Sequence, residues 1–119
     1  SGNVAIGHAA LHYNTERSNL VAIGDSALFN NQHNVTGEFY SFYNTAVGGK
    51  ALLSNTSGYN NTSVGYKSLY SNVSGSGNSA LGNSALENNS GSYNTALGTY
   101  SMQENTSGKR NTAVGSSSL

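Results

Sequence analysis

Apolar residues along this chain come in short runs that recur at a nearly constant spacing. Residues 4–7 read Val-Ala-Ile-Gly, and a similar run follows six more times, as Thr-Ala-Val-Gly near residue 45 and Thr-Ala-Leu-Gly near residue 95. The glycines that end these runs are Gly7, Gly24, Gly48, Gly65, Gly82, Gly98 and Gly115. Successive glycines lie 17, 24, 17, 17, 16 and 17 residues apart, which indicates a tandem repeat of about 17 residues with one insertion of seven.

Polar positions keep the same register as the glycines. Asparagine stands four residues before the glycine in six of the seven repeats, with Leu20 as the exception. A small residue and then a long apolar one follow the glycine at the third and fourth positions, and asparagine returns at the seventh. The consensus is N-T-A-V-G-x-x-A-L-x-x-N-T-S-G-x-x. Several columns in step across the whole chain predict one repeat domain over residues 1–119.

This pattern favours short strands over helices. The segment N-T-A-V-G suits a strand of about five residues, because Val, Ile and Thr favour extended backbone and successive side chains alternate between faces. The segment x-A-L-x-x is interpreted as a second short strand, and Asn and Gly supply the turns. A helix would carry Gly and β-branched residues in its interior, at a cost of about 1 kcal/mol per Gly.

Two strands and two turns per repeat predict an all-β fold, a parallel β-solenoid or β-roll of about seven coils. Equivalent residues of successive coils would then stack, and the asparagines would form ladders that satisfy turn amides and carbonyls. At roughly 4.8 Å per coil the solenoid would be about 33 Å long.

Strand alternation leaves two orientations open. In the favoured one, the Ala column and the Leu column face each other across a thin interior, and the Val/Ile/Leu column faces outward. The alternative places Val inward and Ala outward. An outward apolar stripe along the rod would favour association with another chain. Its members are Ile6, Ile23, Val47, Val64, Leu81, Leu97 and Val114.

Composition excludes several functional classes. Only 8% of the residues are charged and the formal net charge is 0, so the chain lacks the electrostatic attraction that nucleic acids and anionic membranes require. There is no apolar run of the roughly 20 residues that a membrane span needs, and we expect no signal peptide in this segment. Cysteine is absent, which removes disulfides and zinc–thiolate sites.

The insertion, at about residues 31–43, concentrates aromatic side chains beside a histidine and a carboxylate. Aromatic groups on a polar scaffold are good contact anchors, and loops on rigid frames often carry binding. Two interpretations stay open: the aromatic side chains cover the rod locally, or they bind a ligand. The candidate ligand-binding residues are His33, Glu38, Phe39, Tyr40, Phe42 and Tyr43.

No catalytic apparatus is visible, and we expect neither an enzyme nor a cofactor. The five acidic residues stand singly, and no Gly-x-Ser-x-Gly nucleophile motif occurs. His8, His12 and His33 are too few and too separated to predict a metal site. Further aromatic residues, such as Tyr66 and Tyr93, fall in the turns, where packing against neighbouring coils is the favoured interpretation.

The motifs Asn3-Val4-Ala5-Ile6-Gly7 and Asn44-Thr45-Ala46-Val47-Gly48 resemble the head repeats of trimeric autotransporter adhesins of the YadA-like type. The likeness extends over essentially the whole chain, although an added N-T-S-G segment lengthens the repeat. The resemblance implies a left-handed β-roll, a homotrimer whose interface is the outward Val/Ile/Leu stripe, and a virulence-associated role in cell adhesion. It implies an extracellular head, anchored to the bacterial outer membrane through another domain, that binds host matrix protein or surface glycan.

Two other functions remain as alternatives. Similar Asn-rich arrays occur in phage-type tail fibres, where this segment would be a structural shaft or a receptor-binding part of the virion. The Thr column, for example Thr45 and Thr62, raises an ice-binding solenoid as a minor alternative, although Val4, Val21 and Ser79 interrupt it.

Overall fold

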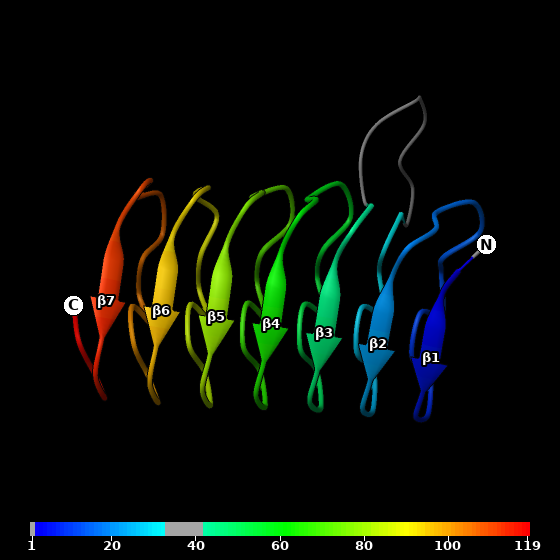
Figure 1. Ribbon diagram of the computed structural model, residues 1–119, viewed down its shortest axis with the longest axis horizontal. Helices are drawn as coiled ribbons and strands as arrows, with labels where there is room; N and C mark the ends of the chain where they lie inside the picture. Colours follow the sequence, from blue (N-terminus) through cyan, green and yellow to red (C-terminus); the bar gives the residue numbers. More distant parts are fainter. Residues whose placement is uncertain (1, 33–41) are drawn as a thin grey trace.

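A computed structural model describes residues 2–32 and 42–119 of the chain. The described residues form an all-β fold without a helix, whose seven short strands lie side by side in one parallel sheet, in chain order (Figure 1). The strands are β1 (Val4–Ile6), β2 (Val21–Ile23), β3 (Thr45–Val47), β4 (Thr62–Val64), β5 (Ser79–Leu81), β6 (Thr95–Leu97) and β7 (Thr112–Val114).

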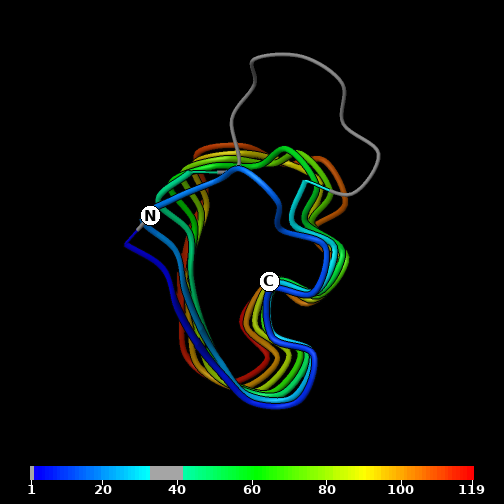
Figure 2. The same ribbon diagram turned by 90° about the vertical axis from the view of Figure 1, so that its right-hand side faces the viewer.

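Like residues stack on like residues through the whole sheet. Val4 pairs with Val21, Ala5 with Ala22, and the same register continues to β7 without a slip. One turn of the solenoid separates each strand from the next, and the turns superpose when viewed along the axis (Figure 2). The longest dimension is 36 Å, close to the length expected from the strand spacing. The predicted tandem β-solenoid is therefore confirmed.

The second strand predicted in each repeat is wrong, and the first is three residues long rather than five. After the glycine the chain makes two consecutive turns, closed in the fourth coil by bonds from Ser68 N–H to Gly65 O and from Asn72 N–H to Leu69 O. Lys67 and Leu69 have positive φ angles of 56° and 50°. A strand would point Ser68 and Leu69 to opposite faces, whereas the turns bury both, so interior packing selects turns.

The interior of the solenoid is built from the two columns that the favoured orientation placed there. Ala46 and Ala80 of the strands lie opposite Leu52 and Leu86 of the turns, and all four side chains are fully or almost fully buried. The outward Val/Ile/Leu column takes no part in this core. The alternative orientation, with Val inward, is wrong, because a coil this thin has room for Ala but not for a second large side chain beside Leu.

Two asparagine ladders supply hydrogen-bond partners for backbone groups that the interior of the solenoid would otherwise leave unpaired. In the first ladder, Asn78 accepts a hydrogen bond at Oδ1 from the backbone N–H of Asn94 at 2.9 Å and donates Nδ2 to the carbonyl of Gly91 at 2.9 Å. The same pair of bonds recurs at Asn44, Asn61 and Asn94. Each side chain thus joins the next coil to a turn of its own coil.

The second ladder runs through the asparagines seven residues after the glycine. Nδ2 of Asn72 donates to Oδ1 of Asn55 at 3.2 Å and to the carbonyl of Gly75 at 2.9 Å. Asn31 belongs to this ladder, since it donates to Asn14 and accepts from Asn55. The regular coil is therefore kept up to Asn31 and resumes at Asn44, with the insertion between them.

Shortening a core leucine is expected to destabilise the rod measurably. Leu69 is fully buried between Leu52 and Leu86 of the neighbouring coils. Leu69→Ala should lower the free energy of unfolding by about 2 kcal/mol, at the lower end of the usual range, because the interior is narrow. Urea unfolding followed by circular dichroism measures this. Val73→Ala, at an exposed site, should change stability by less than about 0.5 kcal/mol, and equal losses for both would contradict the core assignment.

Candidate functional site

The outer face of the sheet carries the apolar stripe, the column formed by Ile6, Ile23, Val47, Val64, Leu81, Leu97 and Val114. Strand pairing brings all seven predicted residues into one line. Leu97 is 43% and Val114 67% exposed, and Ile6 and Leu81 fall between these values. Beside the stripe runs the column of Val, Thr and Ser that begins each strand, so the outward side chains of the strands include no charged group.

A shallow groove of about 200 Å³ lies on this face across β4, β5 and β6. Leu81 and Leu97 form one wall, and Thr62, Ser79 and Thr95 form the other. The alanines of β5 and β6 form its floor, since their buried side chains point inward and none of them rises between the two walls. The groove is shaped for a row of apolar side chains and offers no ionisable group for chemistry.

Four of the six candidate ligand-binding residues, His33, Glu38, Phe39 and Tyr40, lie outside the described residues. The other two, Phe42 and Tyr43, are neighbouring rings with centroids 6.1 Å apart. Phe42 is partly covered, because the guanidinium of the buried Arg17 lies 5.1 Å from its ring centroid. Tyr43 is 62% exposed, so at this edge of the insertion one ring packs and the other faces solvent.

Tyr43 belongs to a ridge that the sequence pattern alone did not reveal. The two residues before each first-ladder asparagine stack from coil to coil on the turn that leads into the strand. We name this surface the pre-strand ridge; from the third coil on it consists of Phe42, Tyr43, Tyr59, Asn60, Ser76, Gly77, Ser92, Tyr93, Lys109 and Arg110. Serine hydroxyls join neighbouring coils of the ridge. Tyr59 N–H donates to Ser76 Oγ, and Ser76 N–H donates to Ser92 Oγ, both at 3.1 Å.

Near its C-terminal end the ridge contains a stacked aromatic–cation pair. A Cβ at Gly77 would lie 2.7 Å from Cδ1 of Tyr93, so the ring of Tyr93 occupies the space that a side chain would take. The guanidinium carbon of Arg110 lies 5.7 Å from the centroid of the same ring. Tyr93 remains 54% exposed. The absence of a side chain at residue 77 is the one signal that could have linked these residues in the sequence.

A second aromatic cluster lies on the turns that follow β4 and β5. Lys67 Nζ sits 5.7 Å and 5.5 Å from the ring centroids of Tyr66 and Tyr70, and 3.9 Å from a carboxylate oxygen of Glu87. Gln103 donates to the other oxygen of Glu87 at 2.8 Å. The lysine and the carboxylate pair with each other. Together with Gln103, they join three successive coils.

His8 and His12, the two histidines among the described residues, contact neighbouring coils. His8 Nδ1 lies 3.3 Å from a carboxylate oxygen of Asp25, and the ring of His12 stacks on Phe29 with centroids 5.0 Å apart. Within residues 2–32 and 42–119, no three His, Cys, Asp or Glu side chains gather into a group that could hold a metal ion. In the same ranges, no helix long and apolar enough to span a membrane is present.

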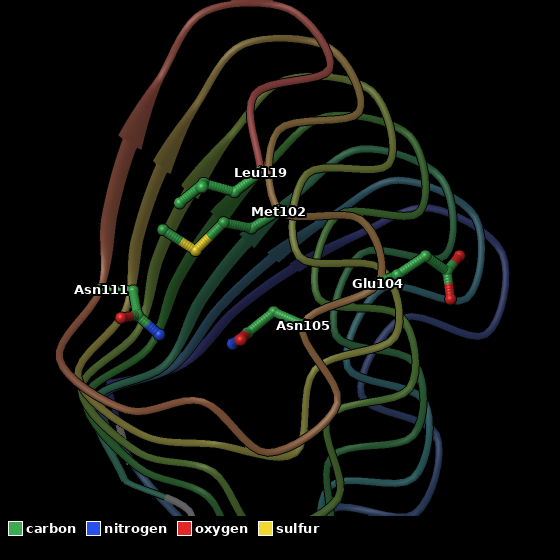
Figure 3. A pocket seen from close by; sticks show the side chains of 5 residues that line it. All are labelled: Met102, Glu104, Asn105, Asn111 and Leu119. Carbon is green, nitrogen blue, oxygen red and sulfur yellow. The ribbon is translucent and has the colours of Figure 1, made fainter.

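A pocket of about 210 Å³ opens at the end of the stack beyond β7 (Figure 3). Met102, Asn105, Asn111 and Leu119 line it, with Glu104 at its rim, where the carboxylate points away from the other four side chains. Met102 and Asn105 are the last members of the buried core column and of the second ladder in this region. The pocket is therefore the end of the interior of the rod, and its single carboxylate lacks a partner for acid–base work.

Comparison with protein-family models, with curated proteins and with solved structures finds no match for this chain. What the described residues define is a class: a tandem-repeat protein with a parallel β-solenoid fold, whose two distinctive surfaces are the apolar stripe and the pre-strand ridge.

Proposed function

We propose that this chain is a segment of a trimeric surface adhesin head, in which three rods pack through the apolar stripe and present their turns to a host surface. The observation that carries the proposal is the uninterrupted outward column of Ile, Val and Leu along the whole sheet. Contiguous apolar surface of this kind marks an association site.

A further copy of the same chain is the partner that fits the stripe best. The outward strand side chains are uncharged, so a charged partner would leave its own charges unpaired there. Another copy supplies an equally neutral apolar column with the same spacing between coils. The number of chains, three, and the left-handed sense of the coil come from the resemblance to YadA-like heads.

Adhesion follows from presenting many weak contacts at once. Three rods with repeated turns offer the same side chains several times, so the overall avidity exceeds the affinity of any single contact. In this proposal the ligand is a host matrix protein or a surface glycan, and the chain acts outside the cell without an enzymatic step.

Introducing charge into the stripe is expected to dissociate the trimer. In light scattering, the unaltered chain should have three times its mass of 12.3 kDa, and Leu81→Lys with Leu97→Lys should shift it to the monomer. A lysine at each site would have to bury an unpaired ammonium group in the interface. Thr99→Lys with Ser116→Lys, on exposed turns, is the matched control and should stay trimeric.

Two results would count against this function. A monomeric unaltered chain would overturn the trimer, and with it the assignment of the stripe. A trimer that is retained by neither collagen, fibronectin nor a glycan array would overturn adhesion and favour the shaft of a tail fibre, for which the ladders and the stripe serve equally well.

A further inference from the structure

We infer that the pre-strand ridge binds an anionic polysaccharide, one that bears carboxylate or sulfate groups. The inference deepens the proposed function, since it names a ligand class and a surface for the adhesive contact. It rests on three observations: a prearranged arginine, exposed aromatic rings set apart along the rod, and a ridge without carboxylates.

Arg110 is the group that would bind the anion. Its guanidinium lies over the ring of Tyr93, and that ring in turn rests on Gly77, so one coil supports the next. Stacking on a ring holds the guanidinium plane while its N–H edge stays free for bidentate hydrogen bonds to a carboxylate or sulfate. Lys109 is exposed beside it and adds a second positive charge.

Tyr43 and Tyr93 would bind the sugar rings. Both side chains are more than half exposed, and an aromatic ring offers an apolar face to the C–H groups of a sugar together with a hydroxyl for hydrogen bonding. Three coils, or about 14 Å, separate them along the axis. Between them only the exposed Asn60 and the side-chain-free Gly77 occupy the first position before the ladder, so an extended chain can lie along the ridge.

The charge distribution favours an anionic ligand. None of the ten residues of the ridge is acidic, although the chain as a whole has as many acidic as basic residues. Lys67, by contrast, already faces Glu87 at 3.9 Å. The two exposed cations of the ridge, Lys109 and Arg110, therefore lie together at one end of it.

A polysaccharide fits this arrangement better than a nucleic acid does. Each strand of nucleic acid carries a phosphate about every 3.4 Å, and binding normally depends on neutralising many of them. The ridge exposes two cations, both in one coil. Two adjacent cations match one charged group of a sugar chain whose neighbouring uncharged rings lie along the rest of the ridge.

The test measures binding of heparin, hyaluronan and neutral dextran fragments to the whole chain by calorimetry. At least one anionic fragment should bind and dextran should not. Lys109→Gln with Arg110→Gln should weaken that binding about tenfold or more. Tyr43→Asn or Tyr93→Asn should weaken it roughly three- to tenfold. Asparagine is chosen because both tyrosines have positive φ, of 56° and 62°, which asparagine tolerates.

Matched controls separate binding from folding. Tyr100→Asn removes a tyrosine from a different column that is 44% exposed and has a φ of 57°, and Lys50→Gln removes a cation away from the ridge. Both should bind as the unaltered chain does, and all variants should keep its circular dichroism spectrum.

Three outcomes would overturn the inference: no anionic fragment binds the folded chain, dextran binds equally well, or ridge variants bind like the controls. Competition by single-stranded oligothymidylate at equal strength would assign the ridge to nucleic acid instead. Light scattering on the same samples keeps the proposed function separate. A monomer that binds heparin through Arg110 would uphold the ridge and reject the trimer, and a trimer that binds collagen alone would do the reverse.

Discussion

Replacing Gly65 with valine is expected to lower the free energy of unfolding by about 4 kcal/mol, enough to unfold a marginally stable rod. Gly65 has a φ of +133°, which side-chain-bearing residues rarely adopt. A Cβ there would also lie 2.4 Å from the carbonyl oxygen of Gly82 in the next coil. Backbone strain and the collision add, because neither coil can move away without breaking the ladder between them.

A neighbouring glycine provides the control for Gly65. A Cβ at Gly49 would meet only the ring of Tyr66, at 3.3 Å, and Gly49 has no positive φ. Gly49→Ala should therefore cost less than about 1 kcal/mol. Urea unfolding at one fixed protein concentration compares the two, since association would otherwise shift the midpoint. A Gly65→Val protein as stable as Gly49→Ala would contradict the close approach of the coils.

Removing the side-chain amide of Asn78 is expected to cost about 3 kcal/mol, because a buried donor left without an acceptor pays its full desolvation penalty. In Asn78→Ala the backbone N–H of Asn94 loses the Oδ1 that accepts it at 2.9 Å. The carbonyl of Gly91 loses one donor but keeps the Nδ2 of Asn89 at 2.8 Å. The loss therefore falls mainly on one buried amide that links two coils.

Asn83→Ala is the matched control for the ladder. Asn83 is exposed on a turn, where its Oδ1 accepts only from the hydroxyl of the adjacent Ser84. Its replacement should change stability by less than about 0.5 kcal/mol, again by urea unfolding. Equal stability of Asn78→Ala and the unaltered chain would show that the ladder contributes nothing beyond filling space.

The repeat columns were readable from the sequence because each has a separate physical cause. Glycine marks the closest approach of two coils, asparagine marks turn groups that need a partner, and the pair Ala-Leu marks the interior. Each cause acts within one coil or between adjacent coils, so the repeat of about 17 residues shows each column six or seven times. The inward Ala column could be preferred on volume alone.

The local backbone between glycine and the second asparagine could not be read in the same way. Residues such as Lys67 and Leu69 have no intrinsic preference for positive φ, and the prediction of a second strand failed there. Burial of Ser68 and Leu69 together outweighs the local cost of left-handed backbone, and that comparison needs the opposite wall of the coil.

The two surfaces of the candidate site differ in the same way, because the sequence predicted one of them and not the other. The apolar stripe followed from strand alternation, because one periodicity places all its members. The pre-strand ridge did not, since Tyr93, Gly77 and Arg110 are 16 and 17 residues apart and meet only when coils stack. By itself the sequence determined the class of fold, its period and its inward columns, which are set by local and nearest-neighbour rules. The tertiary structure alone decided how the turns bend and which side chains of different coils come together, because those contacts depend on the closed shape of the whole coil.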